Sequence, residues 1–461
     1  MVMAVLQIIE TLSSLSKRLP RVIRFISCLV QGHLKKLNPR KKFWQVRKAR
    51  RGDRSARRIR MRRSRAKPPG MPYENNVLLG RRSALTPLLS KDEALKCFIP
   101  NNGIHWADEE HGSIVRRVKM AASHRMPSEF CLERNYEDTA RMLLGIRDRM
   151  NSNLSAYFLK REISNGTRKR GKYYFDFGTI DYISPAAALV FAAEYDRARQ
   201  FLPRWSLKVY NRKSWKPTVI ATLEQLGFFD LLDISVEPTL PAHRQLQMTR
   251  FHQSDSIAQE QAAGFLRELA ALIGVTEGVN QRIGQTRLYE AIVEATENTM
   301  THAYDESPRK EEFVAKRWWM TGAADPVEGK LTVVVYDQGA TIPVRLPESP
   351  LWRDKLGRFA LKMFGSEELA RSSKNDARML RLAMTQPTSS TGNSNQGKGL
   401  GILKAVVEHC EAGRLLVLSR NGEYMYQSGS RPQYRQLPVP FYGTLIQWDL
   451  WRPEWKVQNA Q

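Results

Sequence analysis

Three alternating glycines, Gly397, Gly399 and Gly401, come directly before the apolar segment Ile402–Val407. The spacing of that segment predicts a helix, and glycines at its start allow other groups to approach the backbone closely. Backbone N–H groups at a helix N-terminus form a site for an anion such as phosphate. The spacing fits neither a Walker loop nor a Rossmann glycine motif, which both require other positions. A flexible hinge is the alternative interpretation.

A second pattern is an apolar strand, predicted at Leu331–Tyr336, that ends in Asp337-Gln338-Gly339. A carboxylate at a strand end can accept a hydrogen bond from an exocyclic amine such as that of adenine. Gly339 would let the backbone approach a flat base closely. An ordinary Asp-X-Gly turn gives the same pattern, so the motif alone indicates little.

A third pattern is a helix predicted at Thr286–Ala303. Its core-facing stripe is expected to consist of Leu288, Ile292, Ala295 and Thr299. Glu294 and Asn298 are four residues apart and therefore lie together on a neighbouring face. A carboxylate and an amide there could position a water molecule and coordinate Mg²⁺ together with substrate phosphates. A solvated helix face is the more common explanation for such a pair.

In this order the three patterns resemble the GHKL (histidine kinase-like, Bergerat-fold) ATPase superfamily over residues 245–452. The segment Ile292–Tyr304 is similar to the family's N box, especially the version in sporulation anti-sigma-factor kinases. The resemblance implies ATP and Mg²⁺ as ligands, with Asn298 holding the metal ion. It also implies that Glu294 is the general base and that Asp337 contacts the adenine amine.

The resemblance extends to the remaining site residues. It implies that the glycine box wraps the triphosphate and that Gly443-Thr444 lies near adenine; the box consists of Gly397, Lys398, Gly399, Leu400 and Gly401. Gly339 matches the first glycine of the family's adenine box, whereas Thr341 replaces the second. The segment from Gly339 to Gly397 is expected to be a nucleotide lid. The lid carries Arg371, Lys374, Arg378, Arg381 and Ser389–Asn395, and we expect Lys398 and Arg381 to face the triphosphate.

Upstream, strands and helices alternate and predict a small α/β domain at residues 130–240. The expected strands are 130–132, 173–177, 206–210 and 231–236, and the expected helices are 136–150, 185–201 and 219–226. The strand Phe175–Phe177, the loop Ile180–Ser184 and the following helix resemble the STAS domain of anti-sigma-factor antagonists, which implies a docking or regulatory role. Pro185 stands where that family has a phosphorylatable serine, which argues against a phosphoswitch.

The N-terminal region is strongly basic. Residues 1–70 hold 21 Lys and Arg against Glu10 and Asp53, and so account for most of the net charge of +27. Such a segment predicts a largely disordered tail with an amphipathic helix, and residues 17–67 would suit nucleic acid or an anionic membrane surface. Alternatives are a solvated tail without a specific partner, or upstream sequence that is not translated. Residues 71–129 are expected to be a linker with one short helix.

Together these patterns predict a mixed α/β chain with a STAS-like domain before a GHKL ATPase domain. Four widely spaced cysteines and the lack of a long uncharged apolar stretch favour a cytoplasmic protein with reduced thiols. The expected function is regulatory ATP hydrolysis or Ser/Thr phosphorylation. A non-catalytic nucleotide sensor and an ATP-driven clamp on nucleic acid stay open as alternatives. The expected partners are a regulatory protein and a second copy of the chain in a homodimer.

Overall fold

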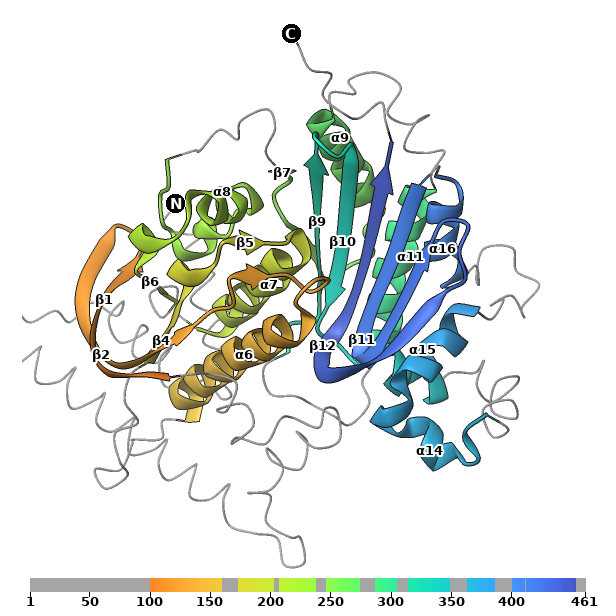
Figure 1. Cartoon of the computed structure of the whole chain (residues 1–461), viewed down its shortest axis with the longest axis horizontal. Coiled ribbons are helices and arrows are strands. Elements are labelled where there is room, and N and C mark those ends of the chain that lie inside the picture. The colour runs from red at the N-terminus through yellow and green to blue at the C-terminus, as the bar shows by residue number, and fades with distance from the viewer. Residues whose placement is uncertain are drawn as a thin grey trace, which may run out of the picture. The chain divides into compact units, whose positions relative to one another are not determined.

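The fold was analysed in a computed structural model, which describes residues 100–159, 173–202, 207–237, 246–273, 287–304, 314–348, 363–385, 400–410 and 412–452. The predictions for residues 1–99, Ser389–Asn395, Gly397, Lys398 and Gly399 lie outside these ranges. The described residues form a mixed α/β structure with several sheets (Figure 1). Cys131 and Cys410 are buried free thiols, as predicted for these two.

The first half of the described chain combines a long hairpin with three helices. Its elements are β1 (Pro100–His111), β2 (Ile114–Arg125), β3 (Glu129–Phe130), α6 (Tyr136–Leu159), β4 (Tyr173–Asp176), β5 (Tyr182–Ile183), α7 (Pro185–Phe201), β6 (Val209–Tyr210) and α8 (Pro217–Leu226). The strands of the larger sheet are ordered β4-β2-β1-β6, and β3 pairs with β5. The predicted helices are confirmed here, and α8 ends before Gly227, which has the left-handed conformation.

Two predictions for this half are wrong. Residues 100–125 form the β1–β2 hairpin, not part of a linker with one short helix. The hairpin has few apolar residues in alternation, and its register instead places Asp108 opposite Arg117 and Glu109 opposite Arg116. Opposite charges across an antiparallel pair stabilise the pairing. Where a strand was expected at residues 231–236, the chain forms a 3₁₀ turn at Phe229–Leu232 and then continues irregularly.

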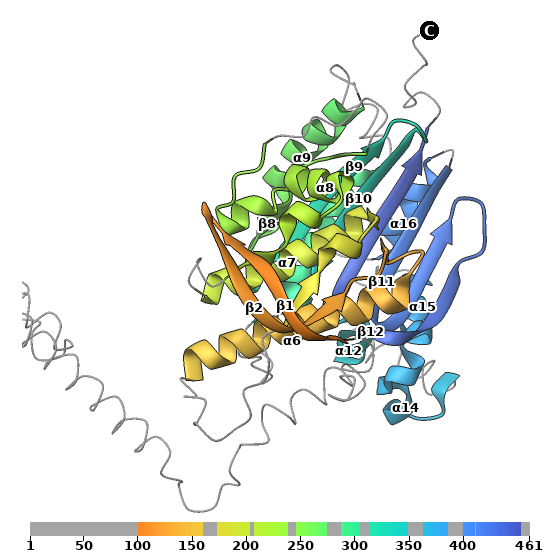
Figure 2. The same cartoon turned by 60° about the vertical axis from the view of Figure 1, so that its left-hand side comes forward.

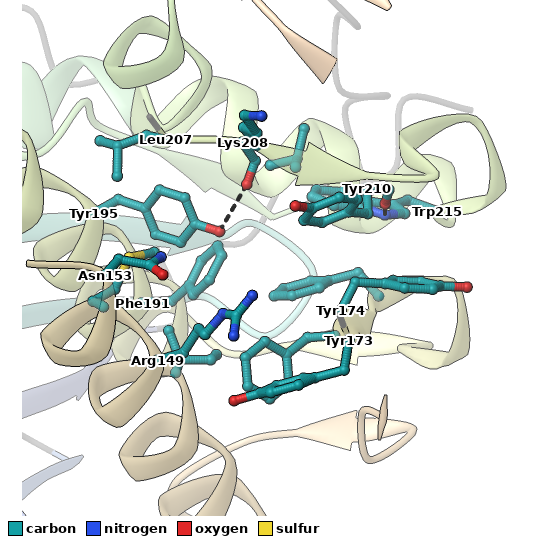
Figure 3. Close-up of a pocket in the computed structure, with 15 residues that line it drawn as sticks. Arg149, Asn153, Tyr173, Tyr174, Phe191, Tyr195, Leu207, Lys208, Tyr210 and Trp215 are labelled. Carbon is teal, nitrogen blue, oxygen red and sulfur yellow. Dashed lines mark hydrogen bonds between the residues drawn. The ribbon is translucent and has the colours of Figure 1, made fainter. Parts of the chain in front are cut away.

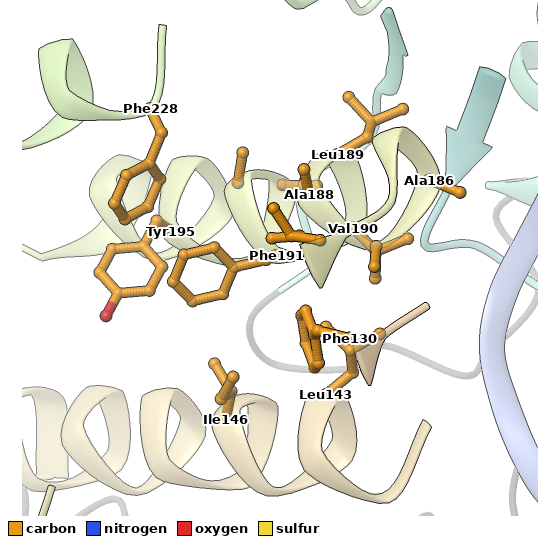
Figure 4. Close-up of a cluster of buried hydrophobic side chains, with 14 of the residues drawn as sticks. Phe130, Leu143, Ile146, Ala186, Ala188, Leu189, Val190, Phe191, Tyr195 and Phe228 are labelled. Carbon is orange, nitrogen blue, oxygen red and sulfur yellow. The ribbon is translucent and has the colours of Figure 1, made fainter. Parts of the chain in front are cut away.

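Helices α6 and α7 face one another across a hydrophobic core. Figure 4 shows Leu143 and Ile146 of α6 beneath Val190 and Phe191 of α7, with Phe130 between the two helices. The hydroxyl of Ser184 accepts a hydrogen bond from the N–H of Ala187 at 3.3 Å and so caps α7. The hydroxyl nearest to the helix start is therefore buried and already used as a cap.

The second half is built around one antiparallel sheet. Its elements are β7 (Gln247–Met248), β8 (His252–Ser254), α9 (Gln259–Leu272), α11 (Leu288–Asn298), β9 (Trp318–Asp325), β10 (Lys330–Asp337), α12 (Ile342–Arg345), α14 (Glu367–Arg371), α15 (Asp376–Thr385), α16 (Gly401–Glu408), β11 (Ala412–Gln427) and β12 (Gln433–Trp451). The sheet order is β11-β12-β10-β9-β7, and β8 also pairs with β9. The predicted helices and strands of this half are present, and β12 begins well before the predicted Gly443.

This sheet is buried on both faces. Val333 and Val335 of β10 pack into a core with α9, α11 and α16, whereas Val334 and Tyr336 pack into the core that contains α6 and α7. Figures 1 and 2 show the two groups of helices on opposite sides of the sheet. Residues of the predicted STAS-like and ATPase regions therefore share one hydrophobic core. This shared core brings the upstream helices close to the strand end that carries Asp337.

Candidate functional site

Helix α11 presents Glu294 and Asn298 side by side. The apolar stripe predicted for this helix is buried, and both polar residues lie half-buried on the neighbouring face. The amide nitrogen of Asn298 donates to the Glu294 carboxylate Oε1 and to the Glu294 backbone carbonyl, each at 2.9 Å. The amide oxygen of Asn298 is thus left as the atom that could ligate a cation. Burial raises the pKa of Glu294, and the Asn298 hydrogen bond partly opposes that rise.

The helix continues into a π-helical turn, Thr299–Ala303, which reaches the end of β10. Single π-helical turns within α-helices often occur at functional sites. The Thr299 hydroxyl donates to the carbonyl of Ala295 at 3.0 Å and lies 3.4 Å from Oδ2 of Asp337. Thr299 therefore connects the helix that carries Glu294 to the carboxylate predicted to contact adenine. The helical periodicity predicts that Thr299 faces the core, but it does not predict the contact of Thr299 with Asp337.

Asp337 ends β10 and is buried, with 6% of its surface exposed. Its Oδ1 accepts a hydrogen bond from the N–H of Gly339 at 2.8 Å. Burial raises the pKa of Asp337 to about 7, although the bonds from Gly339 and Thr299 lower it. A buried carboxyl whose pKa lies near neutral pH, in contact with the π-helical turn after α11, is a candidate functional group.

Gly339 allows a close contact within the protein itself. A Cβ on Gly339 would lie 2.5 Å from the Cβ of Ala303 and 2.6 Å from its carbonyl oxygen. The neighbouring N–H of Ala340 donates to that same carbonyl at 2.8 Å. The missing side chain thus lets the β10 end pack on the π-helical turn, whereas approach to a flat base was the role expected from the sequence.

Thr444 lies directly opposite Asp337 in the β10–β12 ladder. Its hydroxyl is 3.0 Å from the hydroxyl of Ser419 on β11, which also accepts a hydrogen bond from the N–H of Ile342. Gly443 has φ of 83°, and a Cβ there would lie 1.9 Å from the carbonyl oxygen of Asp337. The Gly-Thr pair therefore brings β12 against the end of β10 at the point where Asp337 stands. Ser419 was not anticipated, since nothing in its sequence context distinguishes it.

The residue that replaces the second family glycine, Thr341, is buried just before α12. Its hydroxyl oxygen has no hydrogen-bond partner among the described residues. Buried hydroxyls are normally satisfied, so a polar group brought to this strand end would find an available partner there. By sequence alone, Thr341 is only a departure from the glycine of the family motif.

Only the last part of the glycine box can be described. Leu400 precedes α16 and packs partly on the core beneath α11, and Gly401 begins the helix. A Cβ on Gly401 would have no neighbour within 4 Å among the described atoms. The described packing therefore does not require glycine at this position, unlike at Gly339 or Gly443. Helices α11 and α16 pack against each other, which brings Gly401 to the same side of the sheet as Glu294.

The basic residues of the predicted lid that were singled out and that the structure describes lie on or beside α14 and α15. Arg381 lies on α15, and its guanidinium donates to the Tyr434 hydroxyl at 2.7 Å while it covers the Tyr434 ring. These contacts hold the Arg381 side chain against the β11–β12 hairpin region, and its expected position beside a triphosphate stays a prediction. Arg371, Lys374 and Arg378 lie in or beside α14 and α15.

A separate cleft lies in the first half, between α6, α7, β4 and β6 (Figure 3). Most of its lining is aromatic, including Tyr173, Tyr174, Tyr195, Tyr210 and Trp215. The Arg149 guanidinium carbon lies 4.5 Å from the centre of the Tyr173 ring. No residue of the cluster around Glu294 and Asp337 lines this cleft.

No protein-family model matches this chain, and none of the curated proteins compared with it is significantly similar. Within the described ranges, no group of three or more His, Cys, Asp or Glu side chains is placed to hold a metal ion. None of the described helices is both long and apolar enough to cross a membrane.

Proposed function

We propose that this chain is a regulatory protein of the GHKL ATPase type, with a STAS-like region upstream, that binds ATP and Mg²⁺ beside Glu294, Asn298 and Asp337. The observation that supports it most is the position of Asp337. A buried carboxyl at a strand end faces the same core as α11, and Thr299 joins it to the helix of Glu294 and Asn298. Glu294, Asp337 and Gly401, which together span just over 100 residues of the sequence, thus lie on one side of the sheet.

The polar groups near the end of β10 suit the edge of an adenine ring. Asp337 keeps acceptor capacity beyond its bonds to Gly339 and Thr299, so it can accept from an exocyclic amine. A carboxyl with a pKa of about 7 can also donate its proton to a ring nitrogen. Thr341 adds a buried hydroxyl without a partner among the described residues. No described atom would contact a Cβ on Gly401, so the described residues leave room for phosphate oxygens at the start of α16.

The polar face of α11 fits Mg²⁺ and proton transfer. Mg²⁺ takes oxygen ligands at near-octahedral geometry and usually keeps several waters and phosphate oxygens, so one amide oxygen from Asn298 is a sufficient protein contribution. Glu294 would accept the proton of the attacking water or hydroxyl as its oxygen bonds to the γ-phosphorus. The bond from that phosphorus to the bridging oxygen breaks, and ADP leaves. The product is inorganic phosphate when water attacks, and a phosphoserine or phosphothreonine when a partner's hydroxyl attacks.

A non-catalytic nucleotide sensor is the second candidate. The face of the sheet opposite α11 is covered by α6 and α7, so a nucleotide at Asp337 would be coupled to the STAS-like region through the strands of the sheet, without contacting that region directly. A sensor needs that connection and does not need turnover. The predicted roles of residues 17–67 in binding nucleic acid or an anionic membrane, and of a second copy in a homodimer, stay predictions.

The test is a calorimetric titration of the full chain with ATP and Mg²⁺, paired with a phosphate-release assay. We expect saturable binding that Asp337→Asn abolishes. Unchanged ATP affinity in that variant would overturn the site assignment. Binding with phosphate release or partner labelling supports the enzyme, and binding without either supports the sensor.

A further inference from the structure

Gln338, the residue after Asp337, points to the opposite face of the sheet and is almost completely buried, with 1% of its surface exposed. Its amide nitrogen donates to Oε1 of Glu194 on α7 at 3.0 Å, and its amide oxygen has no partner among the described residues. A methionine of similar size would fill the same space without an unsatisfied oxygen. Packing alone therefore does not explain the glutamine, and its hydrogen bond to Glu194 is the interaction that a methionine would lose.

Glu194 is a buried anion held by two arginines. Its Oε1 also accepts from Arg147 of α6 at 2.6 Å, and its Oε2 accepts from Arg197 at 2.8 Å. Burial disfavours the charged form, but the two arginines outweigh that effect and lower the pKa of Glu194. A carboxylate with fixed bonds on both oxygens is a rigid anchor, so the acceptor offered to Gln338 has a defined position.

The same cluster also contacts β12. The guanidinium carbon of Arg147 lies 3.2 Å from the centre of the Tyr442 ring, and the carbonyl of Tyr442 accepts a hydrogen bond from the Tyr336 hydroxyl. Tyr442 directly precedes Gly443, and Tyr336 directly precedes Asp337. Side chains from the upstream helices thus contact both chain segments one residue from the candidate site: Arg147 contacts Tyr442 before Gly443, and Glu194 contacts Gln338 after Asp337. A small cavity adjoins Arg147, Glu194 and Tyr442.

We propose that Glu194 is a positioning residue of the nucleotide site, which acts from the STAS-like region by holding Gln338 and so fixing the backbone of Asp337 against adenine. This inference rests on the proposed ATP site. If this inference is correct, a shift of α7 changes the position of Asp337 and so the affinity of the site for adenine. The upstream region then regulates nucleotide affinity without touching the nucleotide.

The variant that tests this is Gln338→Met, since replacing Glu194 would leave two buried arginines without their anion and put folding at risk. Gln338→Met removes the bond and also the unsatisfied oxygen, so the thermal unfolding midpoint should stay unchanged or rise. The matched control is Gln447→Met. Gln447 is a buried glutamine on the same face of the same sheet, its amide also donates to carboxylates, and its amide oxygen is also unsatisfied, but it lies three residues beyond Thr444.

Affinities of the full chain for ATP and for GTP are measured by calorimetry with Mg²⁺. We expect Gln338→Met to weaken ATP binding about tenfold, as for residues that share a hydrogen-bond network, and to weaken GTP binding less. The preference for ATP over GTP should therefore fall, which a general loss of stability would not cause. Gln447→Met should keep the wild-type affinities and preference.

Wild-type ATP affinity and preference in Gln338→Met would overturn the positioning role alone and leave the ATP site intact. Equal weakening in Gln447→Met would also overturn it, because the effect would then be a general response to polar substitution in the sheet. Failure of the wild-type chain to bind ATP would overturn the proposed function and this inference together. The wild-type titration therefore separates the two failures.

Discussion

The amide nitrogen of Asn298 donates to the carboxylate of Glu294 at 2.9 Å, across one turn of α11. This bond orients both side chains: it aims the amide nitrogen of Asn298 at Glu294 and leaves the amide oxygen for another partner. It also stabilises the charged form of a carboxylate whose pKa is raised by burial. This arrangement suits the proposed roles of Glu294 as a proton acceptor and of Asn298 as a metal ligand.

Substitution of the carboxylate tests its role as a base. We expect Glu294→Gln to bind ATP with nearly wild-type affinity, since the amide oxygen can still accept from Asn298. Phosphate release or transfer should fall by roughly 100-fold or more, because the variant cannot take up a proton. Glu290→Gln, an exposed carboxylate one turn earlier on the same helix, is the control and should keep wild-type turnover. Equal turnover in the wild type and Glu294→Gln would rule out the base.

Substitution of the amide tests its role as a metal ligand. Asn298→Ala should raise the Mg²⁺ concentration needed for half-maximal ATP binding, by about tenfold if the amide oxygen is a ligand. It also removes the hydrogen bond that lowers the pKa of Glu294, so the pH at which turnover begins should move upward. A Mg²⁺ titration at fixed ATP measures the first effect. Binding of ADP without Mg²⁺ should not change, and an unchanged Mg²⁺ requirement would contradict the assignment.

The sequence predicted those parts of the fold that depend on local periodicity. Helices α7 and α9 begin and end where their apolar spacing and flanking residues place them, and β10 is close to its predicted range. The β1–β2 hairpin was missed because its strands mix polar, charged and apolar residues, with Asp108 opposite Arg117 and Glu109 opposite Arg116, and so give no clear period-two apolar signal. The 3₁₀ turn after α8 was taken for a strand because Leu231 and Leu232 are buried in either conformation.

The candidate site was predictable residue by residue but not in its connections. Glu294, Asn298 and Asp337 belong to motifs, and so they can be found without a structure. Thr299 and Ser419 contribute through contacts that depend on how α11, β10 and β11 meet, which no local pattern encodes. The contact between Glu194 and Gln338 joins residues 144 positions apart and follows from the shared core.

Gly443 is required by backbone geometry, and a second glycine provides its control. Both Gly443 and Gly429 have positive φ, at 83° and 72°, but only the Cβ at Gly443 would meet a neighbour, 1.9 Å from the carbonyl of Asp337. We expect Gly429→Ala to cost about 1 kcal/mol of unfolding free energy from backbone strain alone. Gly443→Ala should cost roughly 3 kcal/mol or more and weaken ATP binding. Urea unfolding of both variants tests this, and equal costs would contradict the close contact.

Gly401 should respond in the opposite way. Its Cβ would contact none of the described atoms at the start of α16, so Gly401→Ala should raise the free energy of unfolding by up to about 1 kcal/mol through helix propensity. The same methyl group would occupy the space assigned to phosphate oxygens. ATP affinity should therefore fall while adenosine affinity changes little. Loss of stability, or equal loss of ATP and adenosine binding, would argue against a phosphate site at this helix start.

Asp337 links binding to stability through its protonation. Its pKa is raised by burial from 3.8 to about 7, so the folded state binds this proton more tightly than the unfolded state does. The resulting stabilisation is fully present below pH 4 and is lost as the pH rises from about 4 to 7. Asp337→Asn resembles the protonated carboxyl and escapes that loss.

We therefore expect Asp337→Asn to unfold with nearly wild-type free energy at pH 4 and to be more stable than the wild type at pH 8, by up to roughly 4 kcal/mol. Its amide oxygen can keep the bond from Gly339, which turns the amide nitrogen toward the place of the adenine amine. Two donors would then meet, and ATP binding should be lost. Urea unfolding at the two pH values measures the first effect. If the stabilities of the two proteins depend on pH in the same way, the pKa of Asp337 is not raised. A gain in stability together with a loss of ATP binding is the result expected of a residue that serves the ligand at a cost in stability.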